Sequence, residues 1–179
     1  GKKVFFFFFQ SVTTRTAGFN TADLTAMSKP SQAIMIALML IGGSPGSTAG
    51  GLKTTTIAVL ILNAIATFRR REDVTAFGRR FDNSAVKNAS TIAIMYFVLF
   101  YFGGIAISTI EKIPLADCLF ESASAIGTVG LSLGLTPTLH PASQDIIIVL
   151  MFLGRVGGLT LIYAALSGTK KINAKLPLD

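Results

Sequence analysis

Two long apolar runs place the strongest limit on what this chain can fold into. Residues 85–110 and 145–166 are each close to or above the roughly 20 residues that a helix needs to cross a bilayer. Of all residues, 51% are hydrophobic and only 14% are charged, whereas an ordinary soluble domain has about 25% charged residues. The sequence therefore predicts an all-α integral membrane protein.

The basic residues indicate which side of the membrane each run reaches. Arginines at 69–71 and 79–80 lie between two apolar runs, and lysines at 170, 171 and 175 follow the last one. Positive residues beside membrane spans favour the cytoplasmic side, so we expect both clusters there, close to anionic lipid headgroups. Nucleic acid is not an expected partner, because both basic clusters flank apolar spans and so follow the positive-inside pattern.

This orientation gives a consistent path through the bilayer. The segment 31–68 runs inward, 85–110 runs outward and 145–166 returns inward. Two shorter apolar segments, 4–14 and 115–126, start on the outer side and are too short to span, so we predict that both are re-entrant. Non-helical backbone is tolerated at membrane depth only where it lines a water-filled cavity or is buried in protein.

The two re-entrant segments end in similar motifs. One reads "QSVTTRTAGF" and the other "ESASAIGTVGL", and each leads into an inward span with a glycine cluster. A unit that recurs in this way is typical of membrane transport proteins built from internal repeats.

The shared ending, Thr-small-Gly-apolar, suits cation selection. A cation that leaves water needs its hydration shell replaced by oxygens, which the Thr-Val-Gly-Tyr-Gly loops of potassium channels supply as backbone carbonyls. Glycine permits the backbone angles that turn successive carbonyls toward one axis. We therefore predict a selectivity filter that binds the ion at the carbonyls of Thr16, Ala17, Gly18, Phe19, Thr128, Val129, Gly130 and Leu131.

Four stretches together resemble a known family. "TTRTAGFNT", "GGSPGSTAGGLKTTT", "AIGTVGLSLGLTP" and "GRVGGLT" are similar to the Trk/Ktr/HKT superfamily of potassium transporters, most of all to the bacterial Ktr-type membrane subunit. The resemblance implies four repeats of outer helix, pore helix, filter and inner helix around one pore. Residues 1–82 resemble the third repeat from its pore helix onward, and residues 83–179 resemble a complete fourth. We therefore expect half of a pore, in a fragment or a split subunit.

The resemblance also implies a gate. A polar stretch interrupts the 31–68 span where the family has an intramembrane loop below the filter, and Pro45 prevents a continuous helix there. A packing kink, the other interpretation, needs one Gly or Pro rather than a long polar stretch. The expected gating residues are Gly42, Gly43, Ser44, Pro45, Gly46, Ser47, Thr48, Ala49, Gly50, Gly51 and Lys53.

Two arginines are also candidate functional residues. Arg155 lies near the middle of the last span, where a charge facing lipid costs about 2.5–3.5 kcal/mol. The resemblance places it beneath the filter, and our hypothesis is that it bonds loop carbonyls in the closed state and repels cations. For Arg15, beside the first motif, two roles stay open: it supports the filter through a bond to Glu121, or it reaches outer water.

These features favour uptake of potassium, with sodium selectivity and sodium dependence left open, through a filter gated by a glycine-rich loop. The alternative is a non-transporting, pore-like scaffold or partner subunit. The chain has one cysteine and no evident catalytic cluster, so neither an enzyme nor a cofactor of this chain is expected. The resemblance further implies a bacterial plasma membrane, contacts with lipid, the remaining pore repeats of the subunit, a homodimer and a cytoplasmic nucleotide-binding regulatory ring.

Overall fold

The computed structural model describes residues 2–20, 23–44, 50–70, 74–76 and 79–157. Its regular secondary structure is helical apart from a short hairpin of two strands with two residues each, in which Thr75 pairs with Arg80. The predicted all-α class is confirmed, and the hairpin is a small addition to it. The elements are α1 (Lys2–Thr13), α2 (Lys29–Leu40), α3 (Thr54–Phe68), β1 (Thr75–Ala76), β2 (Arg79–Arg80), α4 (Asn83–Glu111), α5 (Leu115–Gly127), the 3-10 helix η1 (Thr136–Thr138) and α6 (Pro141–Val156).

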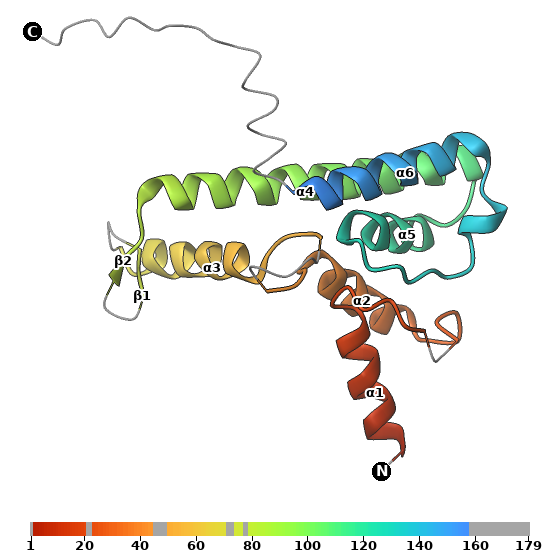
Figure 1. The fold of residues 1–179 in the computed structure, drawn as a ribbon, viewed down its shortest axis with the longest axis horizontal. Coiled ribbons are helices and arrows are strands. Elements are labelled where there is room, and N and C mark those ends of the chain that lie inside the picture. Colours follow the sequence, from red (N-terminus) through yellow and green to blue (C-terminus); the bar gives the residue numbers. More distant parts are fainter. Residues whose placement is uncertain (1, 21–22, 45–49, 71–73, 77–78, 158–179) are drawn as a thin grey trace, which may run out of the picture.

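Helix α4 runs along the whole body of the molecule (Figure 1). Helix α3 packs along the half of α4 that is next to the hairpin, while α5 and α6 pack along the other half. Helix α5 also contacts α2, so it lies among three other helices. Helix α1 projects away from this body.

Helix α4 is the one helix within the described residues that is long and apolar enough to cross a membrane. It contains the predicted span 85–110. Large apolar side chains of α4 face outward, among them Ile94, Phe97 and Phe102, each more than half exposed. Of the predicted span 145–166, α6 forms the first part, and residues 158–166 lie outside the described residues.

The predicted span 31–68 is two helices separated by a loop. Pro30 lies in the first turn of α2, where its fixed φ and missing N–H are tolerated. Helix α2 ends at Leu40 and α3 begins at Thr54. The polar, glycine-rich stretch therefore breaks the helix where the sequence predicts it.

Helix α5 forms the centre of the core, with Cys118 and all residues from 120 to 127 buried. Two adjacent glycines let α4 approach it closely. A Cβ on Gly104 would lie 2.5 Å from Leu119 Cδ2, and one on Gly103 would lie 2.7 Å from Leu150 Cδ1 of α6. Ser122 Oγ donates a buried hydrogen bond of 2.8 Å to the carbonyl of Phe100. These contacts hold α5 in a defined position between α4 and α6.

The end of α4 and the starts of α5 and α6 lie together. Helix α4 stops at Lys112, whose φ is 57°, and Pro114 follows before α5 begins. The backbone N–H of His140 donates to Glu111 Oε1 at 2.7 Å, and His140 Nδ1 accepts from the N–H of Ala142 as the N-cap of α6. This junction fixes where α5 enters the core.

Candidate functional site

The two predicted filter motifs have the same unusual backbone conformation. Thr16 and Thr128 have φ angles of 65° and 53°, and Gly18 and Gly130 have φ angles of 71° and 88°. The residue between each pair does not have a positive φ. Positive φ is uncommon for β-branched residues such as threonine. We call α1 with residues 14–19 unit one, and α5 with residues 128–131 unit two.

Each motif directly follows the C-terminal end of its helix. In unit one, the N–H groups of Ala17 and Gly18 both donate to the carbonyl of Thr13 at 3.2 Å. In unit two, the N–H of Val129 donates to the carbonyl of Ser124 at 2.9 Å. The C-terminal end of a helix carries partial negative charge and stabilises cations nearby. Both helices therefore present their negative ends to the motifs.

The structure brings the two motifs into contact, although they lie far apart in the chain. A Cβ on Gly18 would lie 2.3 Å from the carbonyl oxygen of Val129 and 3.7 Å from the Cα of Gly130. This space admits only glycine at position 18. Gly130 and Phe19 are exposed, whereas Val129 and Leu131 are buried.

Glu121 supports unit two through bonds that the sequence did not predict. Its side chain is only 4% exposed. Oε1 accepts from Ser132 Oγ and from the N–H of Leu133, both at 2.8 Å, and Oε2 accepts from Thr136 Oγ1 at 2.9 Å. These bonds tie α5 to the segment after the motif. Ser132 and Thr136 follow "TVGL" closely in the sequence, and their hydroxyl groups were the signal that could have indicated these bonds.

This arrangement corrects the suggestion that Arg15 supports the filter through Glu121. Arg15 is exposed, and an ion pair between described residues joins Lys29 to Asp117. The carboxylate of Glu121 already has three donors from the segment that follows unit two. Of the two roles left open for Arg15, the structure agrees with the solvent-facing one.

Gln10 occupies the position in unit one that Glu121 occupies in unit two. It is just as buried, at 3% exposure. Within the described residues, neither Nε2 nor Oε1 of Gln10 has a hydrogen-bond partner. A buried amide without partners destabilises a fold by about 1–3 kcal/mol, so the two units differ sharply at this position.

The loop between α2 and α3 is closed at its neck. The N–H of Gly42 donates to the carbonyl of Leu52 at 2.7 Å, and the N–H of Leu52 donates to the carbonyl of Leu40 at 3.3 Å. Residues 42–44 and 50–53 are the described part of this loop. Five predicted gating residues, Pro45, Gly46, Ser47, Thr48 and Ala49, lie outside the described residues.

The described end of the loop lies against the base of unit two. The N–H of Gly50 donates to Thr128 Oγ1 at 2.9 Å. A Cβ on Gly50 would lie 3.0 Å from the carbonyl oxygen of Gly154, and one on Gly51 would lie 3.4 Å from the Cα of Gly127. The loop, the second motif and α6 therefore meet at one place.

The two predicted gating cations lie close to this place in the chain. Lys53 is half-buried and precedes α3, two residues after Gly51. Arg155 is exposed and lies in the last turn of α6, directly after Gly154. Sequence reasoning missed Tyr96 of α4, whose hydroxyl donates to the Gly154 carbonyl at 3.3 Å, and no local pattern could have revealed it.

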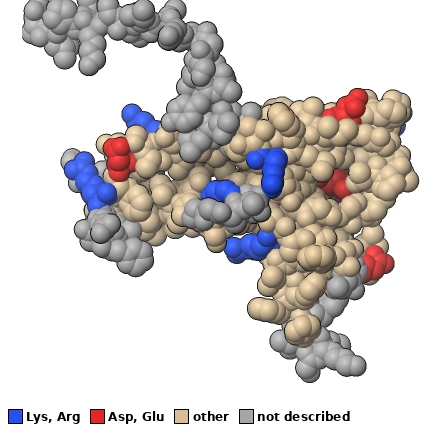
Figure 2. Space-filling view, in the orientation of Figure 1, with Lys and Arg blue, Asp and Glu red and all other residues tan. Residues whose placement is uncertain are grey.

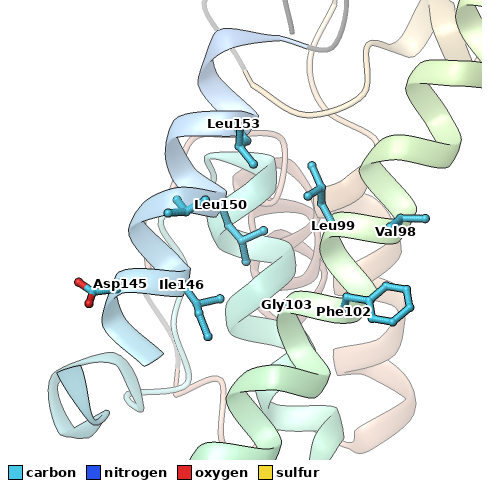
Figure 3. A pocket seen from close by; sticks show the side chains of 9 residues that line it. Val98, Leu99, Phe102, Gly103, Asp145, Ile146, Leu150 and Leu153 are labelled. Carbon is cyan, nitrogen blue, oxygen red and sulfur yellow. The ribbon is translucent and has the colours of Figure 1, made fainter. Parts of the chain in front are cut away.

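A hollow of about 320 Å³ lies beside unit two. Its lining includes Glu121, Ser124, Ser132 and Thr136 together with residues 128–131. A second hollow, of about 360 Å³ between α4 and α6, is lined almost entirely by apolar side chains such as Leu99, Phe102 and Leu150 (Figure 3). The first is lined by several oxygen-bearing side chains suited to a cation, whereas the second has one, Asp145, at its edge.

Charge is distributed unevenly along the molecule. Exposed Arg69, Arg70 and Arg80 lie at the end formed by α3 and the hairpin, while Glu111 and Asp145 lie where α4 ends and α6 begins. Figure 2 shows basic residues at the hairpin end and over the middle of the body, and acidic residues mainly at the opposite end. Arg71 and the lysines at 170, 171 and 175 lie outside the described residues.

Comparison with known proteins agrees with these features. A family model described as TrkH, cation transport protein, matches residues 1–171. Among curated relatives, Ktr system potassium uptake protein B of Bacillus subtilis is 37% identical over 95% of this chain. Potassium/sodium uptake protein NtpJ of Enterococcus hirae is 40% identical over 93% of it. Ktr system potassium uptake protein D of Bacillus subtilis is 40% identical over 96% of it.

The chain spans 38% of the length of each of these three relatives. It therefore corresponds to a part of them and not to their whole length.

Proposed function

Since the chain belongs to the TrkH family of cation transport proteins, which are transporters and not enzymes, we propose that it forms part of a potassium pathway through a membrane. The carbonyl groups of Thr16–Phe19 and Thr128–Leu131 line two of the four sides of a selectivity filter. The observation that carries this proposal is the contact between Gly18 and the backbone of Val129 and Gly130.

The backbone of both motifs supports a role in ion coordination. Because the sign of φ alternates from Thr16 to Gly18 and again from Thr128 to Gly130, successive carbonyls turn toward one side of the chain. In a β-strand they would alternate between opposite sides. Rings of such carbonyls replace the water of a potassium ion, and the helix ends behind them add negative potential.

The relatives' names support potassium as the ion, and one name includes sodium. We propose potassium as the main substrate and keep sodium as a second ion whose role the experiment below decides. No cofactor of this chain takes part in the proposal.

The pore is completed by residues beyond this chain. The chain spans 38% of the length of the first relatives, and two motifs supply two sides of a four-sided filter. We assign residues 1–82 to a third repeat, with pore helix, filter and broken inner helix. Residues 83–179 form a fourth repeat with its own outer helix.

The loop at 42–53 is the gate in this proposal. Its described end lies directly below unit two, against Thr128 and Gly154, where it would obstruct an ion leaving the filter. Arg155, next to Gly154, opposes cations electrostatically when the loop is in place, and Lys53 contributes to the same barrier. Glu121 keeps the second motif in shape through its three bonds.

The distribution of charge supports one orientation. The arginine-rich end lies in the cytoplasm, according to the positive-inside tendency, and the mouth near Glu111 and Asp145 faces outward. The apolar face of α4 contacts lipid or other repeats of the subunit. We place the protein in a bacterial plasma membrane as a homodimer. A cytoplasmic nucleotide-binding ring would bind this homodimer at its arginine-rich end.

Uptake of rubidium and sodium by liposomes containing the intact subunit tests the proposal. Gly18→Ser and Gly130→Ser are each expected to lower the preference for rubidium by roughly tenfold, the effect of about 1.4 kcal/mol in differential binding. Arg155→Gln is expected to raise flux through the closed protein. Preference unchanged in both glycine variants would reject the filter, and absence of any uptake would favour the non-transporting scaffold.

A further inference from the structure

Within the described residues, a hydrogen bond joins the loop to unit two and has no equivalent at unit one. The N–H of Gly50 donates to Thr128 Oγ1 at 2.9 Å. Thr16, which has the same backbone conformation, makes no hydrogen bond to the described loop residues. We propose that the hydroxyl of Thr128 is a latch that holds the gating loop against unit two. The proposal rests on the proposed function, in which this loop is the gate.

The fit around Gly50 shows how closely the loop is held. A Cβ at this position would lie 2.3 Å from Oγ1 and 2.6 Å from Cγ2 of Thr128, and 3.0 Å from the carbonyl oxygen of Gly154. Gly50 is buried. The backbone of the loop therefore lies in direct contact with the threonine side chain, and only glycine allows this approach.

The surface that receives the loop is held from three helices. A Cβ on Gly154 would lie 2.1 Å from the carbonyl oxygen of Ile126, so α6 and α5 are in backbone contact there. Tyr96 of α4 bonds the carbonyl of Gly154 from the other side. Since these helices pack firmly against one another, the loop is the part that moves when the contact opens.

The bond lies next to the neck of the loop. The neck is closed by the bond from Gly42 to Leu52 and by the bond from Leu52 to Leu40, and Gly50 is two residues from Leu52. Breaking the bond between Gly50 and Thr128 therefore favours release of the loop from the base of the filter.

The hydroxyl can serve the loop and the ion together. A threonine oxygen has two acceptor lone pairs and one donor hydrogen. Gly50 uses one lone pair, which leaves the other for a cation at the motif. The position of the loop therefore affects an oxygen atom of the filter. Through its hydroxyl, Thr128 is a positioning residue for the gate, and through its carbonyl it lines the filter.

The test measures the exposure of the loop in the intact subunit, reconstituted in liposomes on a cysteine-free background. Ser44→Cys, at an exposed loop position, is the probe, and the rate of its reaction with a membrane-impermeant thiol reagent is the readout. Thr128→Val removes the hydroxyl and keeps the shape. It is expected to raise the rate by about two- to ten-fold, the range that one ordinary hydrogen bond allows.

Three further variants separate a latch from a merely structural role. Thr128→Ser keeps the hydroxyl and is expected to restore the original rate. Thr16→Val makes the same change at a motif without the bond and is expected to leave the rate unchanged. Thr128→Ala replaces the valine variant if size-exclusion chromatography shows that the latter does not fold. An unchanged rate in Thr128→Val, or an equal rise in Thr16→Val, would overturn the latch.

Rubidium and sodium uptake in the same liposomes distinguishes the two proposals. If both threonine variants weaken rubidium preference while the reaction rate stays unchanged, the latch fails and the filter stands. If Thr128→Val raises the rate while Gly18→Ser and Gly130→Ser leave preference intact, the latch stands and the filter fails.

Discussion

Units one and two have closely similar backbones but very different surroundings. Both end a short helix with a threonine and a glycine at positive φ. In unit two, helix α5 is enclosed by α2, α4 and α6 and its residues 120–127 are buried. In unit one, helix α1 projects from the body, and Phe5 and Phe8 are 72% and 66% exposed. The shared conformation is thus a property of the motif, because it persists when the packing around it changes.

The buried side chains behind the motifs show the difference most clearly. Glu121 has three donors, whereas the equally buried Gln10 has no partner in the described part of the chain. Unit two is therefore stabilised within this chain. Unit one keeps an amide that is unsatisfied within the described residues.

The largest expected effect comes from replacing each of these residues by leucine. Glu121→Leu leaves Ser132, Leu133 and Thr136 without their acceptor, so it should lower the free energy of unfolding by roughly 3 kcal/mol or more. Gln10→Leu removes an unpaired polar group and should be neutral, or stabilising by up to about 1 kcal/mol. Thermal midpoints of the intact subunit in detergent measure both. Equal losses would mean that Gln10 has a partner elsewhere in the subunit, and the contrast between the units would then disappear.

A smaller difference is expected between the two motif glycines. Alanine at a positive φ costs roughly 1–2 kcal/mol at either position. Gly18→Ala also forces a Cβ against the carbonyl of Val129, while a Cβ at Gly130 has nothing nearer than 3.9 Å. This overpacking should add about 1–3 kcal/mol for Gly18→Ala alone. The same thermal midpoints check this, and a larger loss for Gly130→Ala would contradict the observed contact between the motifs.

The smallest effect is expected at the ion pair that links α2, which follows unit one, to unit two. Lys29 Nζ lies 2.6 Å from Asp117 Oδ1, and the lysine side chain is 66% exposed. Exposed ion pairs contribute about 0–1 kcal/mol to stability, so Lys29→Met should lower the free energy of unfolding by less than about 1 kcal/mol. About 1 M salt should remove the difference between this variant and the original protein. Lys87→Met on the exposed side of α4 is the matched control. A salt-independent loss above this range would mean that the pair holds the two units together.

Much of this organisation could be predicted from the sequence. The long apolar run predicts α4, the stretch of glycine, serine and proline predicts the break between α2 and α3, and the two Thr-small-Gly motifs predict equivalent turns. Each of these depends on residues close together in the chain, through helix length, propensity and the backbone freedom of glycine.

The partners of the charged and polar side chains could not be predicted in the same way. Pairing Arg15 with Glu121 was reasonable because a buried arginine favours a carboxylate, but Arg15 is exposed and Glu121 accepts bonds from the segment that follows unit two. Burial and pairing depend on which helices pack against a segment, and that is decided over long distances in the chain.

The sequence by itself determined the helices, their interruption and the two motifs, because these follow from local composition and backbone preference. Only the tertiary structure decided that Gly18 meets Val129, that Gly50 bonds Thr128, and that Glu121 is satisfied while Gln10 is not. The physical reason is that these contacts join residues far apart in the chain, whose approach depends on how α5 packs among its neighbours.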